Sequence, residues 1–119
     1  MAGIGIPWQA FELDELARQR EDERRAYLEF LRAGSMSAGL YVLPAGGVDP
    51  QQPHREDELY FVVSGAAVLE VAGEQQSVRA GSAVFVAAGI SHRFHSISRD
   101  LTVLVFFAPA ESAPAPRAE

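Results

Sequence analysis

Residues 53–63 read PHREDELYFVV, a polar stretch that leads directly into an apolar one. Successive side chains of a β-strand point to opposite faces, so Glu58 and Tyr60 would share one face. By the same rule Gln52 and His54, two residues apart, can point in one direction. The stretch therefore predicts a strand that carries a carboxylate near its start, with an imidazole and an amide just ahead of it.

A second polar group, His92, follows the apolar run 83–88 and a glycine turn. The chain has three histidines, and two of them, His54 and His92, occupy such strand-end positions. Two imidazoles and one carboxylate can bind a divalent transition metal and leave positions open for water or substrate. Ser96 would share the face of His92, whereas His95 would point outward.

The composition indicates one soluble globular domain. The chain has 119 residues, of which 48% are hydrophobic and 22% charged, as in ordinary globular proteins. No apolar stretch approaches the roughly 18 residues that span a bilayer, and the start lacks the pattern of a signal peptide, so we expect a cytoplasmic protein without a membrane partner. The net charge of −6 argues against a nucleic-acid partner, which requires a basic surface. Because cysteine is absent, any metal must be held by nitrogen and oxygen.

The first part of the chain predicts a short helix and then a hairpin. Residues 11–17 have apolar side chains at helical spacing. The polar stretch 18–25 would give a longer helix no face to bury, so we end the helix near Arg20. Residues 26–32 and 36–43 flank a glycine-containing turn and favour a hairpin, although 26–32 also suits a helix.

From residue 59 onward, short β segments alternate with turn residues, which is typical of a sandwich or barrel. The expected strands are 59–63, 66–71, 77–79, 83–86, 92–97 and 101–107. An alanine- and proline-rich end predicts a disordered tail. The expected organisation is an arm with a short helix over 1–25, a barrel domain over 26–108 and the tail over 109–119.

The spacing of the polar residues resembles the first motif of the cupin family, G-x5-H-x-H-x3-or-4-E-x6-G. Its fixed positions are occupied by Gly46, Gln52, His54, Glu58 and Gly65. The chain departs from the motif once, with glutamine in place of the first histidine.

The second cupin motif, G-x5-P-x-G-x2-H-x3-N, is matched with the same spacing. Its positions fall on Gly81, Ala87, Gly89, His92 and Ser96. Alanine replaces the proline and serine replaces the asparagine. The short gap between the motifs is similar to that of compact single-domain cupins.

This resemblance implies an all-β fold, namely a double-stranded β-helix (the cupin jelly-roll barrel) with a short N-terminal helix. It also implies a metal near the open end of the barrel, with His54, Glu58 and His92 as ligands. Gln52 would complete the site loosely, orient a water or not bind. The ion would be a divalent transition metal, and Fe, Mn, Ni, Co and Zn all suit two imidazoles and a carboxylate.

Three functions remain open. The first is a metal-dependent enzyme, dioxygenase-like or isomerase- and lyase-like, acting on a small organic molecule; Glu58 would be a ligand and proton shuttle, and Tyr60 or Gln52 would position the substrate. The second is a non-catalytic cupin that binds a small molecule, with a structural or absent metal; the lost histidine at Gln52 favours it. The third, a metal-free enzyme similar to sugar-nucleotide isomerases, is disfavoured because basic residues are scarce in the β region. Tyr60 otherwise fills the barrel.

A homodimer is expected from the resemblance. A chain this short also has difficulty covering every edge of its sheet, and uncovered edges favour pairing with another chain. The hairpin over residues 26–43 is the expected contributor to the interface.

Overall fold

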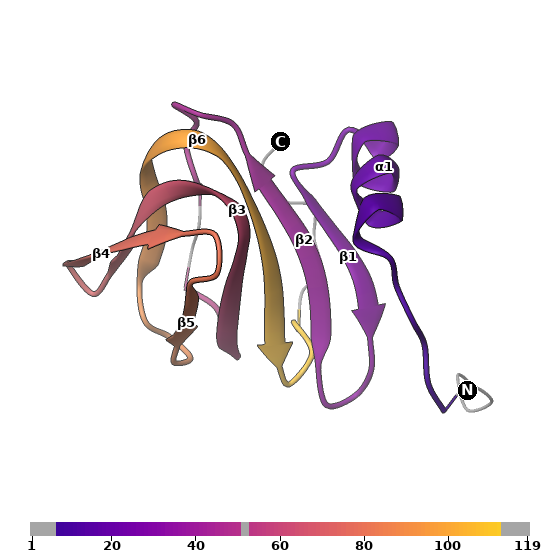
Figure 1. The fold of residues 1–119 in the computed structure, drawn as a ribbon. Coiled ribbons are helices and arrows are strands. Elements are labelled where there is room, and N and C mark those ends of the chain that lie inside the picture. Colours follow the sequence, from indigo (N-terminus) through magenta and orange to yellow (C-terminus); the bar gives the residue numbers. More distant parts are fainter. Residues whose placement is uncertain (1–6, 51–52, 113–119) are drawn as a thin grey trace.

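The computed structural model of the chain describes residues 7–50 and 53–112 (Figure 1). Within these ranges the helix α1 (Leu13–Glu23) is followed by the strands β1 (Tyr27–Arg32), β2 (Ser37–Leu43), β3 (Asp57–Val71), β4 (Glu74–Arg79), β5 (Ala83–Val86) and β6 (His92–Ala108). The predicted all-β fold with a short N-terminal helix is confirmed. The described residues contain no helix long and apolar enough to cross a lipid bilayer.

The two long strands β3 and β6 form an antiparallel ribbon that curves over on itself (Figure 1). Their register runs from Asp57 opposite Ala108 at one end to Val71 opposite His92 at the other. The register shifts several times around Gly65. Such irregularities bend a strand and increase its twist, so the ribbon can wrap around a core.

The other strands flank this ribbon. β2 pairs with the C-terminal half of β6, and β1 pairs with β2. β5 pairs with the first half of β3, and β4 pairs with its second half. Each half of β3 therefore has a different outer neighbour, which divides one continuous sheet into the two walls of a barrel.

Successive residues along β3 point alternately into the barrel and towards its surface. Glu58, Tyr60 and Val62 are buried, whereas Leu59 and Phe61 are substantially exposed, as the period of two predicts. The largest fully buried apolar side chains of the interior include Tyr60, Phe94, Phe107, Leu69, Leu101, Val62, Val86, Val103 and Val105.

The helix α1 lies beside β1 at one side of the sheet (Figure 1). Its buried residue Leu16 packs with Leu28 of β1 and Leu40 of β2. The β1–β2 pairing also confirms the hairpin that was predicted over residues 26–43. Leu16, together with the partly buried Ala17, therefore attaches α1 to the outer side of this hairpin.

The helix is one turn longer than the prediction, continuing past Arg20 to Glu23. No side chain in residues 18–25 is buried, so apolar packing does not explain the extra turn. The amide of Gln19 donates to the Glu23 carboxylate at 2.9 Å, and the Arg20 guanidinium donates to the carbonyl oxygen of Arg25 at 2.7 Å. Local polar contacts close the last turn.

The predicted breaks at residues 64–65 and 98–100 are not strand ends. Both lie inside long strands, and pairing continues through them, with Ser64 opposite Thr102 and Ala66 opposite Arg99. Turn-forming residues in these segments mark a bend of the ribbon instead of a chain reversal.

The end of the described chain also differs from the prediction, because residues 109–112 were assigned to a disordered tail. They pack against the barrel instead. Glu111 is buried, and its N–H donates to the Ser37 hydroxyl at 3.0 Å. The N–H of Ser112 donates to the Glu56 carboxylate at 3.0 Å. Specific hydrogen bonds hold this segment in the absence of apolar periodicity.

The bend of the ribbon predicts a large penalty for Gly65→Ala. The φ angle of Gly65 is 97°, and a Cβ there would collide with the carbonyl oxygen of Asp100 and lie 2.8 Å from the Cα of Leu101. These are backbone atoms, so they cannot rotate away. We expect the free energy of unfolding to fall by about 2–4 kcal/mol, measured by urea denaturation.

Gly73→Ala is the matched control. Gly73 has a similar φ of 85°, but nothing lies within 4 Å of its added Cβ. It should cost only about 1 kcal/mol. Equal losses in the two variants would show that the close approach at Gly65 contributes nothing.

Candidate metal centre

His54, Glu58 and His92 come together in the structure. Each offers one ligand atom, and these three atoms lie within 4.8 Å of one another. The side chains of Glu58 and His92 are 1% and 2% exposed, and that of His54 is 13% exposed. A single ion could therefore contact all three groups, and little solvent would compete for two of them.

The fold brings Glu58 and His92 together from opposite ends of the β3–β6 ribbon. In the register, Glu58 lies opposite Phe107, whereas His92 lies opposite Val71. They are therefore not cross-strand neighbours. Their contact exists because the ribbon folds over and its two ends face each other across the barrel.

The loop before β3 positions His54. The N–H of Gly89 donates to the carbonyl oxygen of His54 at 2.7 Å, and the N–H of Ala88 donates to the Asp57 carboxylate at 2.9 Å. These bonds attach the loop to the turn between β5 and β6, which leads to His92. Both imidazoles are therefore carried by segments that are bonded to each other.

His92 is held with one nitrogen directed at the site. Its Nδ1 lies 2.8 Å from the carbonyl oxygen of Ile90, which can only accept, so the proton belongs on Nδ1. Its Nε2 lies 2.9 Å from Oε1 of Glu58. A carbonyl partner on the outer nitrogen is the usual arrangement that leaves the other nitrogen free to bind a metal.

The inner atoms of this pair lack hydrogen bonds. Both carboxylate oxygens of Glu58 and Nε2 of His92 are buried, and none has a hydrogen-bond partner of acceptable geometry among residues 7–50 and 53–112. Buried polar atoms are nearly always satisfied. Glu58 and His92 form an ion pair only when His92 is protonated, so a neutral imidazole leaves the buried carboxylate without a counter-charge. The donor set therefore fits a divalent cation, which would satisfy all of these atoms at once.

The electrostatics agree with a site for positive charge. Burial lowers the pKa of His92, but the contact with Glu58 and the bond to the Ile90 carbonyl outweigh burial, so the pKa lies above its ordinary value. A cation that binds here would displace this proton from Nε2.

Tyr60 lies beneath the site. Its ring is 5.9 Å from the imidazole of His92 and 4.9 Å from the ring of Phe94, in both cases edge to face. Tyr60 is fully buried and belongs to the main core. The structure thus makes it a packing residue that also fixes the plane of His92.

The other sequence candidates lie elsewhere. Gln52 lies outside the described residues. Ser96, expected to share the face of His92, has a φ of 52° and is exposed, because this left-handed residue breaks the alternation. His95 is not part of the metal group, by which we mean His54, Glu58 and His92. Its nitrogens lie 2.6 Å from the Gln75 amide oxygen and 2.9 Å from the Ser96 hydroxyl.

Glu111 is a site residue that the sequence analysis missed. Its Oε2 lies 3.3 Å from Nδ1 of His54, and its side chain is 8% exposed. It had been assigned to the tail because its surroundings show no periodicity. The pairing of the strand ends would have indicated its position. Ala108 lies opposite Asp57, so the residues that follow Ala108 pass near the start of β3.

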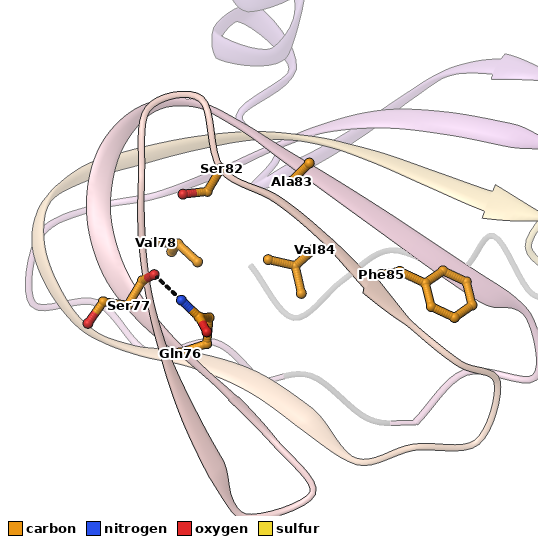
Figure 2. Close-up of a pocket in the computed structure, with 7 residues that line it drawn as sticks. All are labelled: Gln76, Ser77, Val78, Ser82, Ala83, Val84 and Phe85. Atoms are coloured by element: carbon orange, nitrogen blue, oxygen red, sulfur yellow. Dashed lines mark hydrogen bonds between the residues drawn. The ribbon is translucent and has the colours of Figure 1, made fainter.

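A hollow of about 430 Å³ lies between β4 and β5 (Figure 2), and none of the three ligands lines it. Figure 2 shows residues of β4 facing Val84 of β5 across it. Its lining residues are Gln76, Ser77, Val78, Ser82, Ala83, Val84 and Phe85. None of these side chains is ionisable, so the hollow offers shape and hydrogen bonds but no acid or base.

Comparisons with known proteins agree with the fold. An uncharacterised protein of Streptomyces coelicolor is 55% identical over 104 residues, covering 87% of this chain and 99% of the relative. An RmlC-like cupin with a double-stranded β-helix fold from Methanocaldococcus jannaschii has a TM-score of 0.70 at 17% identity, covering 88% of this chain and 94% of that chain.

An enzyme is also similar in fold. DMSP lyase DddQ from Ruegeria pomeroyi has a TM-score of 0.65 at 21% identity, covering 82% of this chain and 53% of that chain. A family model described as a cupin domain matches residues 39–108. These residues contain most of the barrel with Glu58 and both imidazoles, and the chain belongs to the cupin family.

Proposed function

We propose that this cupin binds one divalent transition metal through His54, Glu58 and His92, and acts on a small organic molecule at the positions that the protein leaves open. The observation that carries the proposal is the set of buried, unsatisfied atoms on Glu58 and His92, with a third ligand atom within 4.8 Å. Their burial is unfavourable unless a proton on His92 or a bound cation supplies positive charge.

The residues around this site have distinct roles in the proposal. When bound, the ion would act as a Lewis acid that polarises a substrate oxygen. The Ile90 carbonyl keeps the proton of His92 on Nδ1, and Tyr60 supports the ring from below. Glu58 has two oxygens, so one can bind while the other accepts a proton from the substrate and returns it. Glu58 is therefore one candidate catalytic residue, and the hydroxyl of Tyr60, whose ring also contacts His92, is the other.

Two reaction classes suit this donor set. Two imidazoles and one carboxylate with open positions are typical of non-haem iron oxygenases, which supports a dioxygenase-like reaction. Isomerase or lyase chemistry is the other class, because polarising a carbonyl or alkoxide oxygen also favours proton removal from the neighbouring carbon. Iron, manganese, cobalt, nickel and zinc all remain suitable ions.

The alternative is a cupin that binds a small molecule without converting it. The specific observation in its favour is the hollow between β4 and β5, which has no ionisable lining residue (Figure 2). A ligand held there would be bound by shape and by neutral hydrogen-bonding groups. The metal would then stabilise the barrel or be absent.

Metal binding should depend on the three proposed ligands. The purified protein should bind about one equivalent of divalent metal. His54→Ala and His92→Ala should weaken binding by more than the roughly 10–100-fold that loss of an outer partner costs. Elemental analysis and competition with a chromophoric chelator measure the effect. His95→Ala is the control and should bind like the wild type, because His95 contacts Gln75 and Ser96 instead. Full metal occupancy in both ligand variants would contradict the site.

Catalysis should require the metal and the Tyr60 hydroxyl. The loaded protein should convert members of a panel of small organic acids and phenols, and the metal-stripped protein should not. Tyr60→Phe keeps the ring packing, so a fall in kcat of about 100-fold with unchanged metal affinity would identify the hydroxyl as an acting group. Compounds that raise the melting temperature and are never converted would favour the binding alternative.

We also propose a homodimer, with an interface on the outer faces of β3 and β5. Leu59, Phe61 and Phe85 are 41%, 39% and 62% exposed, and the register sets Leu59 beside Phe85. Adjacent apolar side chains on one sheet face favour burial against another surface. The outer side of the β1–β2 hairpin, the contributor that we expected, is covered by α1. A second copy can place the same patch against its own in an isologous contact.

The dimer is tested by light scattering coupled to size-exclusion chromatography. The wild type should have twice the mass of the chain at micromolar concentration, and Phe85→Asp should shift it towards the monomer because a charge cannot be buried there unpaired. Val48→Asp replaces an exposed apolar residue of a loop and should leave the mass unchanged. A monomeric wild type rules the interface out.

A further inference from the structure

The segment that follows β6 brings a carboxylate to the metal group. After Ala108 the chain turns towards the β1–β2 hairpin, where Glu111 is buried with 6% of its surface exposed. Its Oε2 lies 3.3 Å from Nδ1 of His54. No part of the proposed function so far uses this contact.

The backbone of Glu111 is held on both sides. Its N–H donates to the hydroxyl of Ser37, which is fully buried, at 3.0 Å. Its carbonyl oxygen accepts from the Arg32 guanidinium at 2.5 Å. The next residue, Ser112, donates its N–H to the buried Glu56 carboxylate. Three anchors from separate elements therefore fix the direction in which the Glu111 side chain can leave the backbone.

Arg32 is itself fixed. Its guanidinium makes two bonds of 3.0 Å to the carboxylate of Glu29. Glu29 also raises the pKa of Arg32, so the anchor keeps its charge. The segment at residues 109–112 is thus attached to β1 through an ion-paired arginine.

The contact of Glu111 with His54 has a chemical consequence. An imidazole carries its single proton on either nitrogen, and a carboxylate can only accept. Glu111 beside Nδ1 therefore favours the proton on Nδ1, which would make Nε2 the nitrogen that binds a metal. Glu111 is not one of the three groups whose ligand atoms converge. Its place is behind the imidazole.

The second imidazole has the same arrangement. Nδ1 of His92 lies 2.8 Å from the carbonyl oxygen of Ile90. Both histidines therefore have an acceptor at Nδ1, one from the backbone and one from Glu111. Such outer acceptors orient metal-binding imidazoles and increase their basicity.

We propose that Glu111 is a positioning residue that orients His54 and fixes its proton on Nδ1, so that Nε2 faces the metal. The inference rests on the proposed metal site and extends it to the segment after β6. In this view residues 109–112 belong to the site as much as the loop before β3 does. Loss of the Glu111 carboxylate should loosen the metal without removing a ligand.

The test compares Glu111→Ala with Glu111→Gln. Zinc affinity is measured by competition with a chromophoric chelator at about pH 8, above the ordinary pKa of imidazole. The alanine variant should bind zinc about 10–100-fold more weakly. The glutamine variant keeps an oxygen that accepts from Nδ1, so it should recover most of this loss. Because glutamine also keeps the volume of the side chain, the tautomer of His54, measured below, separates a positioning role from a purely structural one.

Glu70→Gln is the matched control. Glu70 also lies near a histidine, with Oε1 3.7 Å from Nε2 of His95, but both side chains are about a third exposed and neither belongs to the three converging ligands. This variant should bind zinc like the wild type. If it weakens binding as much as Glu111→Ala does, the effect is one of overall charge and the proposal is overturned.

Nitrogen NMR of the metal-free proteins gives a second measurement. His54 in the wild type should show a proton mainly on Nδ1, and this preference should be lost in Glu111→Ala. An unchanged tautomer together with unchanged zinc affinity overturns the proposal. If the wild type binds no metal at all, the proposed function fails, and the tautomer of His54 alone decides the role of Glu111. If Glu111→Ala does not fold, the test uses Glu111→Gln instead. In that variant His54 should keep its proton mainly on Nδ1, and a tautomer preference of His54 equal to that of His95 would contradict the proposal.

Discussion

The metal group exists because the β3–β6 ribbon folds over on itself. Glu58 lies opposite Phe107 and His92 lies opposite Val71, so thirteen residue steps of β3 separate their positions. At about 3.3 Å for each step a straight ribbon would hold them roughly 40 Å apart. Nε2 of His92 nevertheless lies 2.9 Å from Oε1 of Glu58. The bend at Gly65 therefore decides whether the site can form.

The same pair links the stability of the barrel to positive charge. A buried carboxylate requires a counter-charge, and in the metal-free protein the proton of His92 supplies it. The folded-state pKa of His92 is raised above the ordinary 6.5, so this stabilisation is fully present below 6.5 and disappears as the pH rises through the raised value. At higher pH the imidazole loses this proton. In the proposed function a divalent ion would supply the positive charge instead.

Sequence patterns predicted what depends on local periodicity. The period of two placed Glu58 and Tyr60 on the inner face of β3, because one face of that strand is buried. Periodicity could not predict that Gly65 bends the ribbon. Glycine occurs both in turns that end a strand and in bulges within a strand, so its presence does not distinguish the two. Glu111 was also missed, because its position depends on bonds to Arg32 and Ser37, far away in the sequence.

In the proposed function, the burial of the three ligands indicates from which side a substrate would reach the ion. The side chains of Glu58 and His92 are 1% and 2% exposed, whereas His54 is 13% exposed. The closed side is filled by Tyr60 and the core, so the open coordination positions face the side of His54. This side is formed by the loop before β3 and by the segment that carries Glu111. Selection of a substrate would then depend on two irregular segments, and such segments vary most among proteins that share a fold.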